Sequence, residues 1–387
     1  MKFIDEFRSS DLAQTLLKKI AGVNDSNKHY RLMEFCGGHT HVIFRHALQQ
    51  LLPDNIEFIH GPGCPVCVLP IARLDKALAL AAQPDVIFCS YGDMLRVPAS
   101  HKRSLFSARA QGADVRVVYS PLDALALAEK ETSKHVIFFA VGFETTTPAT
   151  AFVIQQAKEK QLRNFSVYCN HVLTPAAIEA ILVSELQDSE NGRVNDATEK
   201  VSPVLIDGFL GPSHVSTIIG SAAYEKICER YKKPVVITGF EPLDVLQAVA
   251  MLLDQINKGE WRVLNEYHRA VSAQGNAKAQ LLTQAIFTLR DKFEWRGLGF
   301  IPDSALRIKD EYKVFDAEQV FSVDVVPSRE YKGCECPAVL RGAIKPLDCK
   351  LFGKPCTPEN PLGSCMVSSE GACSAYWHYA RSAVSHA

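Results

Sequence analysis

The chain has 387 residues, of which 47% are hydrophobic and 22% charged, a composition typical of a globular protein of two or three domains. Lys and Arg (42) nearly balance Asp and Glu (43), so the net charge of -1 creates no strong field that would attract nucleic acid or an anionic membrane. No apolar run approaches the ~20 residues that cross a bilayer, and the first ten residues are not those of a signal peptide. We therefore expect a cytoplasmic protein with no nucleic-acid or membrane partner.

Between residues 31 and 257, short β-branched or aromatic runs alternate with helix-length amphipathic stretches. This alternation predicts parallel strands joined by crossover helices, and the nearly all-apolar runs are typical of strands buried on both faces. The predicted strands are 31–35, 56–60, 85–91, 114–120, 135–143, 165–170, 203–209 and 234–240. The predicted helices are 40–52, 70–83, 121–131, 148–160, 174–187, 214–231 and 242–257.

The predicted fold class is α/β, with two Rossmann-like parallel-sheet domains and a cysteine-rich C-terminal domain. A short repeated motif supports two related α/β domains, because Pro-Leu-Asp occurs at 121–123 and again at 242–244, each time directly after a predicted strand. From about residue 258 the alternation is lost, and the sequence of 277–293 resembles that of a longer helix. We predict domains over 1–131, 132–257 and 258–387.

The first candidate site is the segment 36–41, Cys-Gly-Gly-His-Thr-His, between a predicted strand and a predicted helix. Ligands of open parallel sheets gather beyond the carboxyl ends of the strands, where this turn lies. The N-terminus of the following helix would favour a thiolate on Cys36 and make it a better nucleophile and metal ligand. The alternative is a small buried cysteine beside a tight turn.

The second candidate site is the segment 61–67, Gly-Pro-Gly-Cys-Pro-Val-Cys, again directly after a strand. Cys64 and Cys67 form a CxxC pair, which can close a small disulfide ring or hold a metal, and the enclosed proline is typical of thiol-disulfide exchange centres. No second CxxC or HxxxH lies nearby, which favours redox use or a site shared with Cys36 over zinc. A purely structural pair remains the alternative.

The third candidate site is the C-terminal cysteine group, which contains six of the twelve cysteines. In a reducing compartment, clustered cysteines indicate metal or redox chemistry. The long spacings and the Gly- and Pro-rich surroundings favour a [4Fe-4S] cluster, with structural zinc or disulfides as alternatives. Its members are Cys334, Cys336, Cys349, Cys356, Cys365 and Cys373.

Three weaker patches follow strands: 142–147, 211–216 with His214, and 239–241. Each offers glycine and a polar or ionisable side chain at the edge of a sheet where ligands bind, although helix capping is an equal alternative. No Walker A or GxGxxG motif follows a strand, so nucleotide binding is not supported.

Taken in order, seven segments resemble the HypD family of [NiFe]-hydrogenase maturation proteins, and the resemblance runs essentially from end to end. They are CGGHTH (36–41), GPGCPVCVLP (61–70), GFETT (142–146), GPSHVSTIIG (211–220), GFEPLD (239–244), EWRGLG (294–299) and MVSSEGAC (366–373). The resemblance implies a scaffold with redox activity, and not a turnover enzyme of the usual kind. On this scaffold an iron atom would receive two cyanides and one carbon monoxide before delivery to the hydrogenase.

The resemblance also implies roles for individual residues. Cys36 is the iron-binding thiolate, shared with the N-terminal cysteine of the small HypC chaperone, with His39 beside it and His214 in the same cleft. Cys64 and Cys67 match the family's redox-active pair, and HypE, the cyanide donor, would dock at the cleft. Cys349, Cys356 and Cys373 match the family's cluster ligands. The first ligand is either Cys334 or Cys336, and Cys365 is the spare.

The chemistry implied by the resemblance fits these residue types. Iron that carries cyanide and carbon monoxide needs a soft thiolate ligand in a dry site. Reductive transfer of cyanide from a sulfur carrier needs two electrons, which a dithiol supplies. The rival hypothesis is an iron-sulfur thiol-disulfide reductase, which explains the CxxC pair and the cluster but gives no role to segment 36–41.

Overall fold

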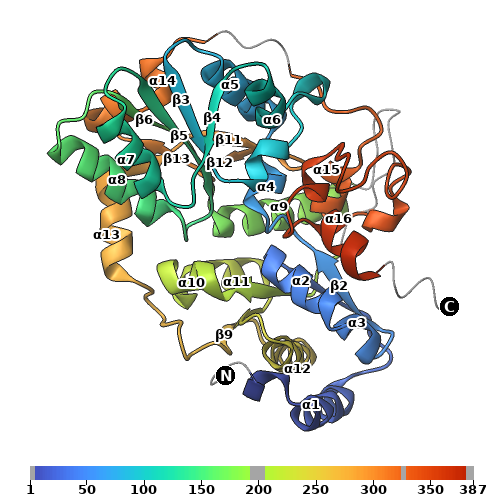
Figure 1. The fold of residues 1–387 in the computed structure, drawn as a ribbon. Coiled ribbons are helices and arrows are strands. Elements are labelled where there is room, and N and C mark those ends of the chain that lie inside the picture. The colour runs from blue at the N-terminus through green and yellow to red at the C-terminus, as the bar shows by residue number, and fades with distance from the viewer. Residues whose placement is uncertain (1–4, 192–204, 324–327, 381–387) are drawn as a thin grey trace.

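The structure is a computed structural model that describes residues 5–191, 205–323 and 328–380 (Figure 1). Its α-helices are α1 Ser10–Val23, α2 Gly37–Arg45, α3 Leu48–Leu51, α4 Pro65–Val68, α5 Ile71–Ala81, α6 Leu105–Ala110, α7 Pro121–Lys130, α8 Thr147–Glu159, α9 Thr174–Asn191, α10 Ser213–Ile219, α11 Glu225–Tyr231, α12 Pro242–Lys258, α13 Ala277–Ile286, α14 Ala317–Val320, α15 Cys336–Leu340 and α16 Ala372–Ala375. Its strands are β1 Tyr30–Glu34, β2 Ile56–His60, β3 Val86–Ser90, β4 Asp114–Val117, β5 His135–Gly142, β6 Phe165–His171, β7 Gly208–Pro212, β8 Val235–Thr238, β9 Val263–Asn265, β10 Phe287–Leu289, β11 Lys292–Trp295, β12 Gly299–Pro302 and β13 Leu306–Ile308.

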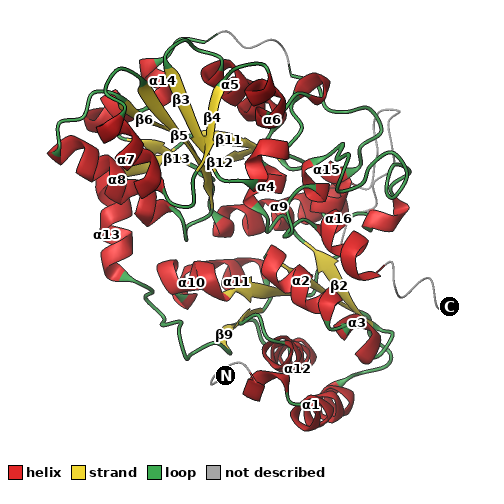
Figure 2. Ribbon diagram, in the orientation of Figure 1, coloured by secondary structure: helices red, strands yellow, loops and turns green. Residues whose placement is uncertain are grey.

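Two parallel sheets form the framework, which confirms the predicted α/β class. The first sheet has the order β2-β1-β7-β8-β9 and the second the order β4-β3-β5-β6. Strands β3, β5 and β6 are almost entirely buried, as their apolar sequences require. Figures 1 and 2 show the two sheets in separate halves of the molecule, each flanked by helices.

The strands are grouped differently from the predicted domain order. The chain leaves the first sheet after β2, builds the whole second sheet, and returns to the first sheet at β7. The predicted limit between residues 131 and 132 therefore does not separate the sheets, because β4 and β5 lie on opposite sides of it and both pair with β3. The division into independently folding units, over 1–131, 132–257 and 258–387, stays a prediction.

Most predicted elements lie within a few residues of the observed ones. The predicted helix 40–52 begins earlier, at Gly37, and breaks at Ala47, whose φ of 49° is left-handed. The predicted helix 214–231 breaks at Gly220. The strand predicted at 203–209 is observed as β7, and residues 203 and 204 lie outside the described residues. Helix α1 and strand β9 were not predicted.

The segment 277–293, whose sequence resembles that of a helix, is only partly helical. Helix α13 ends at Ile286, and the buried side chains of Phe287 and Phe293 belong to strands that form two small antiparallel sheets, β10-β13 and β11-β12. The cysteine-rich segment that follows packs against α2 and α4, close to the carboxyl ends of β1 and β2 (Figure 1). Residues far apart in sequence therefore meet at one place.

The two Pro-Leu-Asp segments form the same local structure. Asp123 accepts from the backbone N–H of Ser120, and Asp244 accepts from that of Glu241, so each closes a capping box at the start of its helix. The predicted helix starts are confirmed at both places. Among the described residues, no helix is long and apolar enough to cross a membrane.

Candidate functional site

Cys36 lies between β1 and α2, where it is the N-cap residue of the helix. Its sulfur accepts the backbone N–H of Gly38 at 3.3 Å, and its carbonyl oxygen accepts the N–H of His39 at 2.9 Å. The Nδ1 and Nε2 atoms of His214 lie 3.6 and 4.0 Å from the sulfur. The turn predicted from the glycines therefore holds Cys36 at the edge of the first sheet, facing an imidazole from α10.

The protonation of Cys36 differs from the sequence expectation. The residue is 2% exposed, and this burial raises the pKa of the thiol well above its ordinary value, with the charge of Glu370 adding to the effect. The N–H of Gly38 lowers the pKa, as expected for a helix N-terminus, but burial is the larger effect. Without a bound metal the sulfur is a neutral thiol, and a cation that binds it must displace the proton.

The two histidines of the predicted site lie on either side of Phe240. Its ring centroid is 4.8 Å from that of His39 and 5.3 Å from that of His214. Burial lowers the pKa of both histidines to about 4, so both imidazoles are neutral at pH 7. His39 Nε2 donates to the carbonyl of Thr238 at 3.2 Å, which leaves the lone pair of Nδ1 buried and without a hydrogen-bond partner among the described residues.

A buried carboxylate supports Cys36 from behind. Glu34 accepts the backbone N–H of Cys36 at 3.0 Å, the hydroxyl of Thr40, and an N–H from His60 Nδ1 at 2.8 Å. The side chain of Glu34 is 1% exposed, so these hydrogen bonds replace water entirely. The sequence analysis missed this residue. The available signal was an acid at the end of a strand, directly after the buried Leu32 and Met33 and two positions before Cys36.

Cys64 and Cys67 form a disulfide at the start of α4. The pair lies next to Cys36 in space, because a Cβ atom added to Gly63 would be only 2.3 Å from the backbone nitrogen of Cys36. Only glycine permits this approach of the two segments. The structure thus brings together the first two predicted sites, which belong to neighbouring strands.

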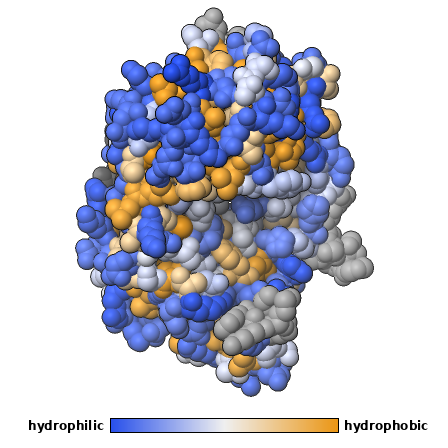
Figure 3. Space-filling model, turned by 60° about the vertical axis from the view of Figure 1, so that its left-hand side comes forward, coloured by the Kyte–Doolittle hydropathy of each residue, from blue (hydrophilic) through white to orange (hydrophobic). Residues whose placement is uncertain are grey.

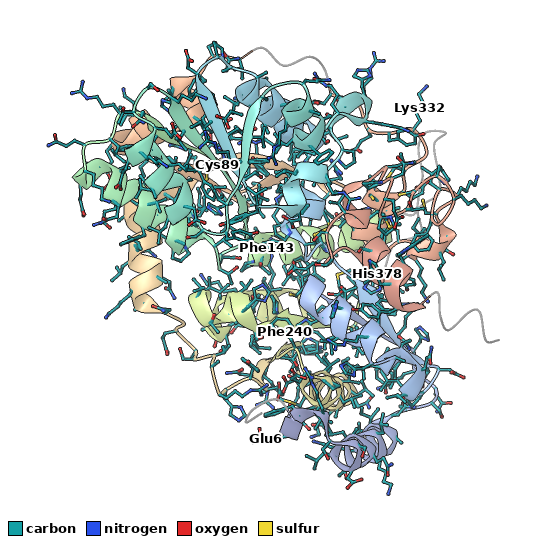
Figure 4. All side chains as sticks on the ribbon, in the orientation of Figure 1. Glu6, Cys89, Phe143, Phe240, Lys332 and His378 are labelled. Atoms are coloured by element: carbon teal, nitrogen blue, oxygen red, sulfur yellow. A yellow bond between two sulfur atoms is a disulfide. The ribbon has the colours of Figure 1, made fainter. Side chains whose placement is uncertain are left out.

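A cavity of about 300 Å³ opens beside these residues. Its lining comes from both halves of the molecule and includes Pro65, Thr145, Thr146, His214 and Glu370. Phe143 and Phe240 lie toward the boundary between the two sheets (Figure 4). On the face drawn in Figure 3, hydrophobic residues gather across the middle, where the surface is hollowed. The cavity therefore lies where segments 61–67, 142–147, 211–216 and 366–373 converge.

Glu144, in the segment 142–147, has a structural role in the described protein. Its carboxylate accepts the backbone N–H and the hydroxyl of Thr174, at 2.8 and 3.0 Å, and so caps α9. Burial raises the pKa of Glu144 to about 7. Thr145 and Thr146 line the cavity, while Glu144 lies behind them.

The C-terminal cysteines gather in loops and short helices. Cys365 lies beside Cys336 and Cys373, and these neighbours lower its pKa to about 5. Cys334 lies beside Cys336, and the N–H of Leu362 donates to Cys356 Sγ at 3.5 Å. Cys365, the predicted spare, thus lies within the group. Cys349, a predicted ligand, follows a 3₁₀ turn (η6, Pro346–Asp348) and is half-buried.

The donor chemistry of this group fits an iron-sulfur cluster. The thiols are soft ligands, and a Cβ atom at Gly363 would lie 2.4 Å from Cys336 Sγ and 2.6 Å from Cys334 Sγ, so the loop passes tightly over the sulfurs. Beside them lies Arg296, 4% exposed, whose Nε pairs with Glu330 at 3.3 Å and whose Nη2 has no hydrogen-bond partner among the described residues, so this buried cation suits an anionic group. Among the described residues, no three His, Cys, Asp or Glu side chains are preformed as a metal site.

Cys89, Cys169 and Cys228 are buried in the cores around the two sheets, as expected for cysteines in apolar strands and helices. These buried thiols outside the site can serve as controls when a cysteine of the site is substituted.

Comparison with known proteins places the whole chain in one family. The family model described as "HypD: Hydrogenase formation hypA family" matches residues 11–380. The hydrogenase maturation factor HypD of Azotobacter vinelandii is 57% identical over 98% of this chain and 97% of its own length. HypD of Escherichia coli strain K12 is 43% identical over 98% of both chains. These matches extend across both sheets and the cysteine-rich segment, and the chain belongs to the HypD family.

Proposed function

We propose that this protein acts in hydrogenase maturation as the scaffold on which the Fe(CN)₂CO group of [NiFe]-hydrogenase is assembled. The observation that carries the proposal is that Cys36 lies against His214 and close to the Cys64–Cys67 disulfide, beside a cavity that His214 and Pro65 line, in a chain whose relatives are named hydrogenase maturation factors. The cargo iron binds to the sulfur of Cys36. The neighbouring imidazoles of His39 and His214 are neutral, so they do not repel the metal.

The buried position of Cys36 suits this cargo. Cyanide and carbon monoxide on low-spin iron require a soft thiolate and the exclusion of water. The sulfur of Cys36 loses its proton when iron binds, and the two ring nitrogens of the neutral His214 lie 3.6 and 4.0 Å from this sulfur. The HypC chaperone supplies a second thiolate at the cavity, and HypE docks there with its thiocyanate.

The Cys64–Cys67 pair supplies the electrons. Cleavage of a thiocyanate, R–S–CN + 2e⁻ + H⁺ → R–SH + CN⁻, consumes the two electrons that the dithiol releases when it becomes the disulfide. The C-terminal thiols, Cys334 or Cys336 with Cys349, Cys356 and Cys373, would hold a [4Fe-4S] cluster, which supplies single electrons when bound. Ser364 lies between the two groups, because its hydroxyl donates to the carbonyl of Cys67 at 3.0 Å and it precedes Cys365. We place this chemistry in the cytoplasm.

Infrared spectroscopy of the anaerobically purified complex with HypC tests the proposal. We expect bands of metal-bound cyanide and carbon monoxide, and we expect both to disappear in Cys36→Ala. The matched control is Cys89→Ala, which removes an equally buried thiol from the second sheet and should keep the bands (Figure 4). Bands that survive in Cys36→Ala would refute the assignment of the iron to this sulfur.

The disulfide itself favours one other function, that of an iron-sulfur thiol-disulfide reductase. A reductase would turn over a disulfide substrate and lose this activity in Cys64→Ala, while Cys36→Ala would leave it intact. If the protein is instead the proposed scaffold, Cys36→Ala must abolish its function. If Cys64→Ala leaves electron flow from the reduced cluster to the bound cargo unchanged, the Cys64–Cys67 pair does not supply the electrons and this part of the proposal is wrong.

A further inference from the structure

A second cavity, of about 530 Å³, lies beside the C-terminal cysteines and is separate from the site of Cys36. Its wall includes Arg296 and Leu362, and exposed basic side chains surround it. We call Lys102, Arg329 and Lys332 the basic rim. Figure 4 shows Lys332 at the outer edge of the molecule, where a large partner can reach it.

The wall of this cavity is also the wall of the cysteine group. The N–H of Leu362 donates to Cys356 Sγ at 3.5 Å, and the charge of Arg296 acts on Cys334 and Cys365. A partner seated on the basic rim would therefore be one layer of side chains away from the sulfurs. The Cys36 site lies beside a different cavity, so a partner on the basic rim would not block it.

The local charge of this surface contrasts with the balance of the whole chain. The net charge of the protein is -1, whereas the cavity is lined by Lys102, Arg329 and Lys332 together with Arg296 and a histidine, His101. Among the described lining residues Glu330 is the single acid, and its carboxylate lies 3.3 Å from Arg296 Nε. An acidic partner would gain favourable electrostatic energy here and would be steered toward the cavity.

The basic rim is held in place by a buried hydrogen-bond network. Asp75 accepts from the backbone N–H and the hydroxyl of Ser100, and from the hydroxyl of Ser328. The hydroxyl of Ser100 in turn accepts the N–H of Arg329 at 2.8 Å, which ties the two basic segments together. Lys102 has a left-handed φ of 59°, and its ammonium lies 4.8 Å from the ring centroid of Tyr331. Such a fixed arrangement favours a docking surface over a loose group of solvated lysines.

We propose that the basic rim docks an acidic iron-sulfur electron carrier, which delivers electrons to the cluster of the C-terminal cysteines. The proposal rests on the function proposed above, since it concerns how that cluster is reduced. In the step, a reduced [2Fe-2S]⁺ carrier gives one electron to an oxidised [4Fe-4S]²⁺ cluster, so the carrier becomes [2Fe-2S]²⁺ and the cluster [4Fe-4S]⁺. No bond is broken and no proton is transferred.

The test uses the anaerobically purified holoprotein and a plant-type [2Fe-2S] ferredoxin as the acidic probe. The variant Lys102→Glu/Arg329→Glu reverses two charges of the rim. The control Lys19→Glu/Lys278→Glu makes the same change in net charge at exposed positions on α1 and α13. Two quantities are measured: binding of the oxidised probe by calorimetry, and reduction of the cluster by stopped-flow absorbance.

We expect the rim variant to weaken binding and slow reduction at least about tenfold at low ionic strength, while the control stays near wild type. The difference should shrink as salt is raised from about 0.02 M to about 0.3 M. Dithionite, a small reductant, should reduce the cluster equally in all three proteins. Equal binding and equal rates in the variant and the control would overturn the proposal.

Two further outcomes are kept distinct. If the wild-type protein contains no inorganic sulfide, the cluster of the proposed function fails, while binding of the probe still tests the docking surface. If inorganic pyrophosphate binds saturably at the rim and the ferredoxin does not bind, the cavity takes a small anion and the docking proposal is wrong.

Discussion

Cys36 and the C-terminal cysteines are both sulfur sites, but different kinds of structure hold them. Cys36 lies at the junction of a buried strand and a helix, with hydrogen bonds from Gly38 to its sulfur and from its own backbone N–H to Glu34. The C-terminal thiols lie in loops and short helical turns, and several of their contacts are with one another. Regular secondary structure positions the first site, whereas loops and short turns position the second.

This difference suits the proposed roles. A site that receives a cargo and releases it must keep its shape when it is empty, because an ordering cost at each loading would weaken binding. A resident cluster can stabilise the loops that surround it, since its binding energy contributes to folding. The following predictions test this contrast, beginning with the largest expected effect.

Exchanging single sulfurs should separate the two sites. In Cys36→Ser the affinity for cargo iron should fall by more than the roughly 10- to 100-fold that loss of a supporting residue costs, while cluster iron and sulfide stay unchanged. In Cys373→Ser the cluster content should fall and Cys36 should still bind iron. Mössbauer spectroscopy and sulfide analysis measure the two pools separately. Loss of both pools in either variant would show that the sites are one folding unit, against the contrast drawn above.

Removing the cluster should loosen only the C-terminal segment. In cluster-free protein we expect amide hydrogens of residues 334–376 to exchange at least about tenfold faster, because the loops lose their shared ligand. Amides of α2 should keep their protection, since strand β1 and Glu34 hold them. Hydrogen exchange with mass spectrometry measures both regions in one sample. Equal protection of the segment with and without the cluster would contradict this prediction.

The sequence predicted the first site better than the second for a physical reason. Segments 36–41 and 61–67 each follow a strand, and parallel neighbouring strands carry their ends to the same edge of the sheet. Their convergence could therefore be expected from local patterns. The pairing of β1 with β7 could not, because it depends on which of eight apolar strands lies beside which, and local patterns do not specify that choice.

Tertiary structure also determines properties that the short motifs do not show. The helix N-terminus at Cys36 does favour the thiolate, but the depth of burial is larger in effect and is not visible in a six-residue motif. The cluster ligands were selected by spacing, whereas the loop over Gly363 brings Cys365 against Cys336 and Cys373. A spacing rule does not include a loop that folds back. Which thiols hold the cluster stays a prediction.

The support behind Cys36 should have a measurable energy. In Glu34→Gln a neutral amide replaces the buried carboxylate that accepts hydrogen bonds from Cys36, Thr40 and His60, and we expect the free energy of unfolding to fall by about 2 kcal/mol, in the range for hydrogen bonds to a charged group. Urea denaturation measures this. The matched control is Glu57→Gln on the neighbouring strand, a half-buried carboxylate that pairs with Lys345 and His29, for which we expect less than about 1 kcal/mol. Similar losses of stability in both variants would mean that the buried Glu34 carboxylate contributes no more to folding than a half-buried one.

The last prediction concerns the pH dependence of stability at His39. Burial lowers the pKa of His39 from 6.5 to about 4 in the folded protein, so between these values the unfolded chain binds more protons. Folding therefore weakens as the pH falls from 6.5 to 4, and the contribution of His39 is at most about 3 kcal/mol.

In His39→Gln this part of the loss should disappear, although the variant will be less stable at pH 7. The measured quantity is thus the slope of unfolding free energy against pH and not its value. Other histidines whose pKa is lowered in the same direction, among them His135, His171 and His214, keep their share of the slope in the variant. His101→Gln, at an exposed position, is the control and should leave the slope unchanged. An unchanged slope in His39→Gln would mean that water reaches His39. The Cys36 site would then not be a dry, preformed site, and the contrast with the C-terminal cysteines would fail.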